Sequence, residues 1–281
     1  MDGILFIDKE KGWTSRDVVN VISRQFQTKK VGHAGTLDPF ATGLLIVLVG
    51  KATKIASFLE AQDKEYEATL LLGEDTDTLD LEGETVLQKE VPDLSLEKIE
   101  EVLHSFQGEI LQDVPKYSAV KYQGKALYQY AFHHESTPSL SRTVTIHDIC
   151  FSSYVNQQLS FSVRCSKGTY IRQLGQDIAH ALSTCGHLTS LRRTKIGNHS
   201  VFEAKKVRDV LESDFVSMKA ALSFLPVQVV DEQTKKDIIN GKTIHLSRSE
   251  DILLTLDQEE NLISILEKKA HHTYIVKRGL F

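Results

Sequence analysis

The sequence predicts an α+β fold, with one large domain followed by a small β-rich domain. Segments with strand-like and helix-like patterns are mixed, without the regular βαβ alternation of a doubly wound sheet. Two β-rich runs between Arg142 and Ser166 predict an antiparallel hairpin. After Leu225-Pro226 the mixed pattern of helices and strands gives way to a pattern of short strands. The 281 residues, 41% of them hydrophobic, are enough to bury a sizeable core.

The expected elements follow from local patterns, taken from the N-terminal end. Thr14-Ser15 precedes RDVVNVISRQF, whose apolar residues have helical spacing, so we expect an N-capped helix there. The segment KEYEATLLLG alternates and then becomes apolar, which predicts a strand that becomes buried. Ser95 is a candidate N-cap for the helix LEKIEEVLHSF, which should end at Gly108.

The second half of the chain predicts a hairpin, a helix and a strand-rich tail. The runs RTVTIHDICFSSYV and LSFSVRCS are separated by NQQ, which suits a hairpin turn. The segment GTYIRQLGQDIAHALST then has helical periodicity up to Gly186. After residue 224 we expect short strands around Asn240–Lys242, so the predicted domains are 1–224 and 225–281.

The net charge of -5 argues against a globally basic nucleic-acid binder, yet the charges are unevenly distributed. Acidic residues crowd into Glu74–Glu101, whereas basic residues cluster at Arg192–Lys195, at Lys205–Arg208, and at Lys116, Lys121 and Lys125. Phosphate binding needs a local positive face rather than a positive total. Charge patterning alone leaves an RNA-binding face and an ordinary solvated surface equally open.

Common cofactor and metal motifs fail when their positions are examined. The segment GKATK lacks the first glycine and the Ser/Thr of a phosphate loop, and DTDTLDLEG lacks the turn glycine and closing glutamate of a calcium loop. Three widely spaced cysteines indicate buried or idle thiols. None of these motifs therefore indicates a phosphate-binding loop, a calcium site or a zinc site. With no signal-peptide pattern and no apolar run of roughly 18 residues, we expect a cytoplasmic protein that does not enter the membrane.

A few isolated polar residues in glycine-rich or apolar settings remain as candidates for chemistry. Asp38 lies in the loop GHAGTLDPFATG, directly before an apolar stretch. Arg172, in KGTYIR, opens a helix after a strand, where an arginine is better placed to pair with a buried carboxylate than to serve the helix end. We expect Asp38 to be that partner. Tyr66 is a third candidate, although it also suits a packed core.

Several separate motifs, in order from Gly3 to Gly197, resemble the TruB family of bacterial tRNA pseudouridine synthases. They are GILFIDKEKGWTSRDVV, VGHAGTLDPFATGLLIVLVGKATK, KEYEATLLLGEDTDTLDLEG, YSAVKYQGKALYQYA, RTVTIHDI, RCSKGTYIRQLGQDIAHAL and GHLTSLRRTKIG. The resemblance implies a mixed, largely antiparallel sheet of the pseudouridine synthase type with flanking helices. It also implies that residues 1–224 are catalytic and that residues 225–281 form a small PUA-like RNA-binding domain.

The resemblance implies that uridine 55 in the TΨC loop of tRNA is isomerised to pseudouridine without a cofactor. The base would leave the ribose through N1 and rejoin it through C5, after being flipped out of the loop. Asp38 would be the nucleophile, attacking either C6 of the uracil or C1′ of the ribose, and Arg172 would hold it in place. Tyr66 would stack on the uracil, and its hydroxyl, near C5, would remove the proton that must leave there.

The same resemblance assigns residues that bind the RNA. His33 would insert into the loop and stack in the place of the flipped base, and Tyr170 and Leu191 would line the uracil pocket, although core packing explains Leu191 nearly as well. Lys121, Arg192 and Arg193 would contact phosphates. The family suggests a monomer.

Two other functions compete with this interpretation. A non-catalytic tRNA-binding or tRNA-folding module would keep the pocket without turnover, but Asp38, Tyr66 and Arg172 are all intact. An aspartate-dependent hydrolase of a small substrate would suit the acidic net charge, yet it leaves the basic clusters unexplained.

Overall fold

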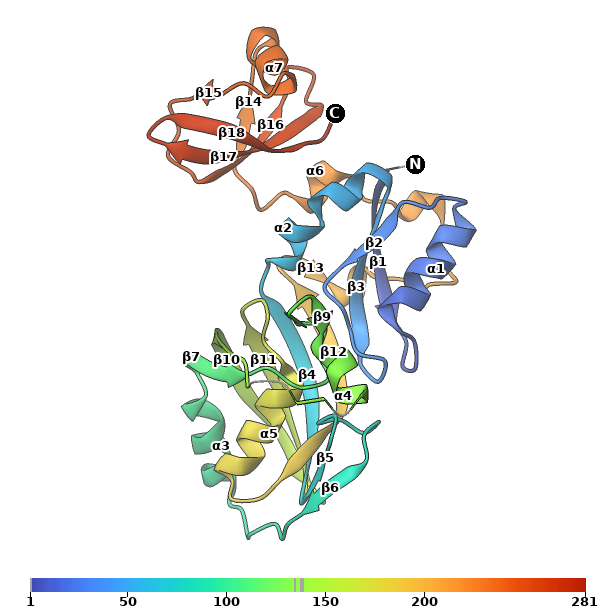
Figure 1. Cartoon of the computed structure of the whole chain (residues 1–281), viewed down its shortest axis with the longest axis vertical. Helices are drawn as coiled ribbons and strands as arrows, with labels where there is room; N and C mark the ends of the chain where they lie inside the picture. Colours follow the sequence, from blue (N-terminus) through green and yellow to red (C-terminus); the bar gives the residue numbers. More distant parts are fainter. Residues whose placement is uncertain (1, 134, 137–138) are drawn as a thin grey trace.

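The computed structural model describes residues 2–133, 135–136 and 139–281, which form a large sheet with flanking helices and a separate C-terminal sheet (Figure 1). Within these residues the large sheet has nine strands, in the order β1-β3-β12-β4-β11-β10-β7, with β2 beside β3 and β13 beside β12. These strands are β1 (Gly3–Lys9), β2 (Val31–Ala34), β3 (Thr42–Val49), β4 (Lys64–Leu72), β7 (Gly108–Asp113), β10 (Ser141–Val155), β11 (Gln158–Cys165), β12 (Gly186–Ile196) and β13 (His199–Ser200).

The large sheet is mixed but mainly antiparallel, as the sequence analysis predicted. The β12–β3 pair is parallel, with Arg193 opposite Gly43, and the other strand pairs of this sheet among the described residues are antiparallel. Gly43 has a φ of +100°, and a Cβ atom there would lie 2.2 Å from the carbonyl oxygen of Arg193. Because only glycine permits this approach, Gly43 lets β3 join β12 directly after the loop that carries Asp38.

Three helices cover one face of this sheet: α1 (Ser15–Gln25), α3 (Leu96–Ser105) and α5 (Ile171–Ala181). The helix α1 begins as predicted, because the Thr14 side chain accepts the N–H of Asp17 and the Asp17 carboxylate accepts the N–H of Thr14. The Ser95 cap of α3 is also confirmed, although α3 ends at Ser105 and Gly108 begins β7 instead. The predicted hairpin is present as β10 and β11.

The apolar run at β3 is continuous because both of its faces are buried. Leu45 and Val47 pack toward α1 in one cluster, whereas Leu44, Ile46 and Leu48 pack in a second cluster on the opposite face. The second cluster also contains Leu254, Ile265 and Leu280 of the C-terminal part. The C-terminal sheet is therefore attached to the large sheet through shared apolar packing.

The C-terminal sheet has five strands within the described residues, in the order β14-β16-β17-β18-β15, which agrees with the β-rich tail that was predicted. The strands are β14 (Val227–Val229), β15 (Ile244–His245), β16 (Ile252–Leu256), β17 (Leu262–Ala270) and β18 (Thr273–Gly279). The sequence analysis missed α7 (Glu232–Ile239), which buries only Ile238 and so has little apolar periodicity. Its detectable signal was Asp231, whose carboxylate caps the helix by accepting the N–H of Thr234 at 2.7 Å.

Short elements fill the connections between these parts. They are η1 (Gly50–Ile55), α2 (Ala56–Glu60), β5 (Glu74–Thr76), β6 (Thr85–Gln88), β8 (Lys121–Tyr122), β9 (Lys125–Ala126), α4 (Leu127–Phe132), η2 (Val201–Glu203), η3 (Glu212–Asp214) and α6 (Met218–Ala221). In the described part of the chain, none of the helices has the length and apolar character needed to cross a membrane.

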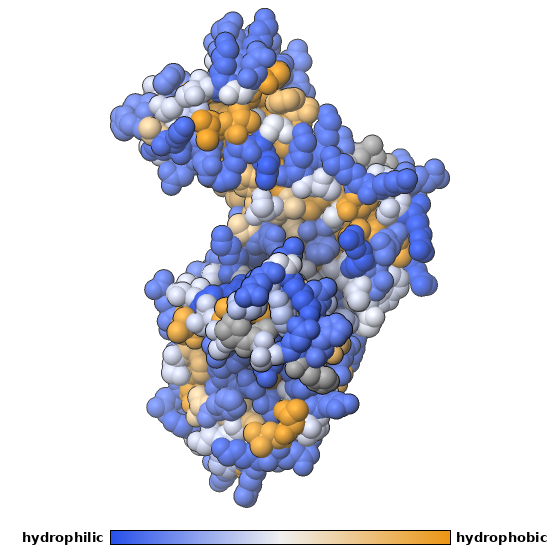
Figure 2. Space-filling model, in the orientation of Figure 1, coloured by the Kyte–Doolittle hydropathy of each residue, from blue (hydrophilic) through white to orange (hydrophobic). Residues whose placement is uncertain are grey.

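Hydrophilic side chains cover most of one face of the molecule, and this face is hollowed between the C-terminal sheet and the large sheet (Figure 2). A groove between α2 and β18 is lined by Lys54, Ser57, Glu60, Lys277 and Arg278, among others. Three cations and one carboxylate therefore face this groove.

Candidate active site

The loop that carries Asp38 connects β2 to β3 and is anchored on both sides of this residue. The buried Ser15 hydroxyl donates to the Leu37 carbonyl oxygen at 3.1 Å and accepts the Leu37 N–H at 2.9 Å. The Pro39 carbonyl oxygen accepts the Gly12 N–H at 2.9 Å and the Lys9 ammonium at 3.2 Å. Because both neighbours of Asp38 are fixed, its carboxylate has little freedom to move away from the sheet.

Lys9 is almost fully buried beneath this loop. Its ammonium group also donates to the carbonyl oxygens of Trp13 and Glu10, at 2.7 and 3.1 Å. Burial lowers the pKa of Lys9 to about 8, and the carboxylates of Asp38 and Glu82 act in the opposite direction. Lys9 thus binds the backbone behind Asp38 and places a positive charge near its carboxylate.

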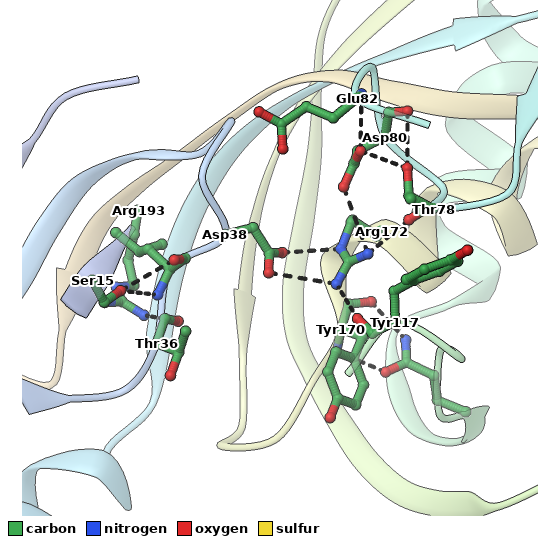
Figure 3. A network of polar contacts seen from close by, with 12 residues as sticks. Ser15, Thr36, Asp38, Thr78, Asp80, Glu82, Tyr117, Tyr170, Arg172 and Arg193 are labelled. Atoms are coloured by element: carbon green, nitrogen blue, oxygen red, sulfur yellow. Dashed lines mark hydrogen bonds and ion pairs between the residues drawn. The ribbon is translucent and has the colours of Figure 1, made fainter. Parts of the chain in front are cut away.

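The predicted ion pair between Asp38 and Arg172 is present (Figure 3). Arg172 Nε lies 2.9 Å from Asp38 Oδ2, and Arg172 Nη2 lies 3.5 Å from Asp38 Oδ1. The arginine side chain is 6% exposed, whereas the aspartate side chain is 36% exposed. The buried guanidinium therefore orients a carboxylate whose other side remains open to a substrate.

A second carboxylate, which the sequence analysis missed, shares the same arginine. Asp80 Oδ2 lies 3.5 Å from Arg172 Nη1, and the Asp80 side chain is 6% exposed. Its Oδ1 accepts the Thr78 hydroxyl at 2.7 Å and the Glu82 N–H at 3.0 Å, so its own turn satisfies Oδ1 and leaves Oδ2 to Arg172. Asp80 lies in DTDTLDLEG, which the sequence analysis considered as a calcium loop and as part of a longer family-like motif, but not as a source of site residues. Its alternating carboxylates were the available signal.

Backbone oxygens complete the surroundings of Arg172. The carbonyl oxygen of Thr78 accepts from Nη1 at 2.7 Å, and that of Tyr117 accepts from Nη2 at 2.9 Å. The Tyr117 hydroxyl in turn donates to the Asp77 carboxylate at 2.9 Å. The arginine thereby joins the Asp38 loop, the turn at Asp80 and the segment at Tyr117, which are far apart in the sequence.

Tyr66 and Leu191 lie on neighbouring strands of the large sheet. Tyr66, on β4, is opposite Arg193 of β12, and Leu191 is opposite Ala68. Both side chains belong to the buried cluster that includes residues of the Asp38 loop. Burial raises the pKa of the Tyr66 hydroxyl, which stays protonated at neutral pH, so the tyrosine presents a neutral ring to its neighbours.

His33 and Tyr170 each lie close in the sequence to one member of the Asp38–Arg172 pair. His33 lies on β2, just before the Asp38 loop, and Tyr170 directly precedes α5, which contains Arg172. Burial lowers the pKa of the His33 imidazole, and the nearby Arg193 adds to this effect. Among the described residues, the buried Nδ1 atom of His33 has no hydrogen-bond partner. A neutral imidazole of this kind can stack on a base without a desolvated charge.

The basic residues that were expected to bind phosphate lie in very different environments. Arg193 is 1% exposed, and its Nε, Nη1 and Nη2 donate to the carbonyl oxygens of Leu44, Thr36 and Gly35. This burial does not fit the phosphate contact predicted for Arg193, which instead ties β12 to the Asp38 loop. Arg192 is about one-third exposed and makes two hydrogen bonds to Asp8, at 2.9 and 3.1 Å. Lys121, on β8, is exposed.

The described residues contain no group of histidine, cysteine, aspartate and glutamate side chains arranged to hold a metal ion.

The chain is similar to known pseudouridine synthases along most of its length. Residues 23–171 match the model of the TruB family pseudouridylate synthase N-terminal domain. The tRNA pseudouridine synthase B of Mesoplasma florum is 34% identical over 278 residues, covering 99% of this chain and 97% of that protein. The tRNA pseudouridine synthase B of Caldicellulosiruptor saccharolyticus is 38% identical over 274 residues, covering 98% and 94%.

Solved structures support the same fold. A Cbf5-Nop10-Gar1 complex contains a chain that this structure matches with a TM-score of 0.76 at 23% identity, covering 99% of this chain and 85% of that one. A chain in an H/ACA RNP bound to a substrate RNA matches with a TM-score of 0.75 at 22% identity, covering 99% and 85%. The sequence matches extend over nearly the whole chain, and the chain therefore belongs to the TruB family of pseudouridylate synthases.

Proposed function

We propose that this pseudouridine synthase isomerises uridine 55 in the TΨC loop of tRNA, with Asp38 as the nucleophile. Its full-length relatives are tRNA pseudouridine synthases B. The single observation that carries the role of Asp38 is its partly exposed carboxylate, bound by the buried Arg172. The other carboxylate on that arginine, Asp80, is buried.

The reaction breaks the bond between N1 of uracil and C1′ of ribose and forms a bond between C5 and C1′. The proton on C5 is lost to solvent, and N1 gains one, so no oxidant, reductant or metal is needed. The Asp38 carboxylate attacks C6 or C1′, and both routes need the same ionised oxygen held in one place. The Arg172 guanidinium supplies that orientation through its contacts with both Asp38 oxygens.

The target base has to leave the folded loop before Asp38 can reach it, at a cost of a few kcal/mol. The Tyr66 ring and the Leu191 side chain offer an apolar surface for the extruded uracil. Burial raises the pKa of the Tyr66 hydroxyl, so this hydroxyl has to lose its own proton before it can remove the one on C5, whereas stacking makes no such demand. The neutral imidazole of His33 takes the place of the base in the RNA stack.

The RNA backbone is held by cations outside the catalytic network. Lys121 is exposed, and Arg192 is partly exposed beside Asp8. We assign residues 1–224 to the catalytic domain and residues 225–281 to a PUA-like RNA-binding domain of a monomer. The cations Lys54, Lys277 and Arg278 in the groove between α2 and β18 support a phosphate-binding role for this second domain.

The test uses an unmodified tRNA transcript with tritium at C5 of uridine, incubated with the wild type and with Asp38→Asn in the absence of metal and cofactor. We expect tritium release, mapped to position 55, by the wild type alone, while both proteins bind the tRNA. Binding without release by the wild type would instead indicate a tRNA-folding module. Absence of tRNA binding would favour a small-molecule substrate.

A further inference from the structure

Tyr170 is held by two residues that face each other across the β7–β10 pair. In this antiparallel ladder Gln112 of β7 is opposite Arg142 of β10. Residues directly opposite in such a ladder point their side chains to the same face of the sheet. Gln112 binds the backbone of Tyr170, and Arg142 lies over its ring. One cross-strand pair therefore restrains both the backbone and the side chain of Tyr170.

Gln112 is fully buried and uses both ends of its amide on Tyr170. Its Oε1 accepts the Tyr170 N–H at 2.8 Å, and its Nε2 donates to the Tyr170 carbonyl oxygen at 3.1 Å. This pattern is the one that a neighbouring strand would offer, supplied by a side chain. A buried amide that lost these partners would leave polar atoms unsatisfied, so this position strongly favours one arrangement of the Tyr170 backbone.

Arg142 restrains the ring of Tyr170, whereas Gln112 restrains its backbone. Its guanidinium carbon lies 5.0 Å from the centre of the Tyr170 ring, within the range of a cation–π contact. Its Nη1 also donates to the Gly168 carbonyl oxygen at 3.4 Å, which binds the turn that leads to Tyr170. The Ser166 carbonyl oxygen accepts the Thr169 hydroxyl at 2.9 Å and tightens this turn further.

We propose that Gln112 and Arg142 form a clamp that fixes the Tyr170 ring against the extruded uracil and thereby sets the distance between the base and Asp38. The inference rests on the proposed function, in which Tyr170 lines the uracil pocket. Neither residue is a catalytic residue, because both act through Tyr170; they are positioning residues. Tyr170 also directly precedes α5, so the clamp fixes the start of the helix that presents Arg172.

The first test replaces Gln112 with methionine, which keeps the length of the side chain but removes the donor and the acceptor. We expect the single-turnover rate of pseudouridine formation to fall about 10- to 100-fold, because the base is misplaced relative to Asp38. The Kd for the tRNA should stay within about threefold, since Gln112 is buried and contacts no RNA. Circular dichroism of each variant checks that the fold is intact.

The second test replaces Gln112 with glutamate and uses the pH to change the protonation of the new carboxyl group. A protonated carboxyl group offers one donor and one acceptor, as the amide does, whereas a carboxylate offers no donor to the Tyr170 carbonyl oxygen. Burial raises the pKa of a glutamate at this position, and the neighbouring Arg142 opposes part of that rise. The rate of Gln112→Glu relative to the wild type should therefore recover as the pH falls, whereas the ratio for Gln112→Met should stay flat.

Arg142→Gln keeps the proposal testable if the Gln112 variants do not fold. A clamp predicts a slower single-turnover rate with an unchanged salt dependence of tRNA binding. A lost phosphate contact would instead reduce the slope of log K against log salt by about one, and that result would overturn the role of Arg142 in the clamp.

The outcomes separate the clamp from the proposed function. The clamp alone is overturned if the wild type is active and the rate of Gln112→Glu relative to the wild type does not change with pH. It is also overturned if Gln112→Met forms pseudouridine at the wild-type rate. A wild type that forms no pseudouridine overturns the proposed function, and the clamp with it.

Discussion

Two regions of the molecule each bring a carboxylate to Arg172, and they differ in how that carboxylate is satisfied. In the turn at Asp80, the carboxylate is buried and accepts hydrogen bonds from Thr78 and Glu82 of its own turn. In the loop between β2 and β3, the flanking backbone is held from behind, and Asp38 remains partly exposed with Arg172 as its hydrogen-bond partner. The buried Asp80 is thus held by its own turn as well as by Arg172, whereas Asp38, the proposed nucleophile, is oriented by Arg172 and left partly open.

The largest effect is expected from Asp38→Asn, which keeps the shape of the side chain and removes the nucleophile. Turnover should fall at least about 10⁴-fold, because the remaining groups only bind and orient the base. The Kd for tRNA, measured by filter binding, should stay close to that of the wild type. Loss of tRNA binding by Asp38→Asn would show that Asp38 serves binding rather than turnover, and would contradict the contrast drawn between Asp38 and Asp80.

Arg172→Lys should lower turnover about 10²-fold, because an ammonium cannot hold two carboxylates and two carbonyl oxygens in a planar arrangement. Arg172→Met should in addition lower the free energy of unfolding by about 3–5 kcal/mol, since Asp80 would stay buried without its partner. Urea unfolding of both variants measures this difference. Equal stability of the two variants would count against a buried, charged Asp80.

Asp80→Asn should reduce turnover by only about tenfold, through a small displacement of Arg172 rather than a loss of chemistry. The asparagine Oδ1 can still accept the Thr78 hydroxyl and the Glu82 N–H. Single-turnover rates on the same tRNA transcript measure the effect, with the Kd as the control for RNA binding.

The smallest effect is expected from Ser15→Ala, which removes the two hydrogen bonds to Leu37 on one side of Asp38. It should cost about 1 kcal/mol of stability and a few-fold in turnover, because the Lys9 contact on the other side remains. Ser213→Ala, at an exposed position of η3, serves as the matched control and should change neither quantity.

Much of the fold and the core of the site could be predicted from the sequence, because they depend on local patterns. The caps of α1 and α3, the β10–β11 hairpin and the pairing of Asp38 with Arg172 each left a signal in a short segment. An arginine at the start of a helix needs a partner, and few carboxylates lie in a comparable setting.

The parts that escaped prediction depend on contacts across the sheet or on which face a side chain occupies. Asp80 was missed because DTDTLDLEG offers several alternating carboxylates, and the sequence alone does not indicate which of them meets Arg172. Arg193 was grouped with Arg192, although neighbours in a strand point to opposite faces, so that one meets Asp8 and the other meets buried carbonyl oxygens. The Gln112–Tyr170 contact joins residues on separate elements, and no pattern within either segment indicates it.

The most direct measurement of the central claim is single-turnover formation of pseudouridine by Asp38→Asn and Asp80→Asn, side by side on one unmodified tRNA. Both variants neutralise one carboxylate on the same arginine, so the comparison isolates the exposed position from the buried one. Our account predicts no detectable product from Asp38→Asn and slower but complete conversion by Asp80→Asn, with both proteins binding the tRNA. Product from Asp38→Asn, or equal losses in the two variants, would contradict it.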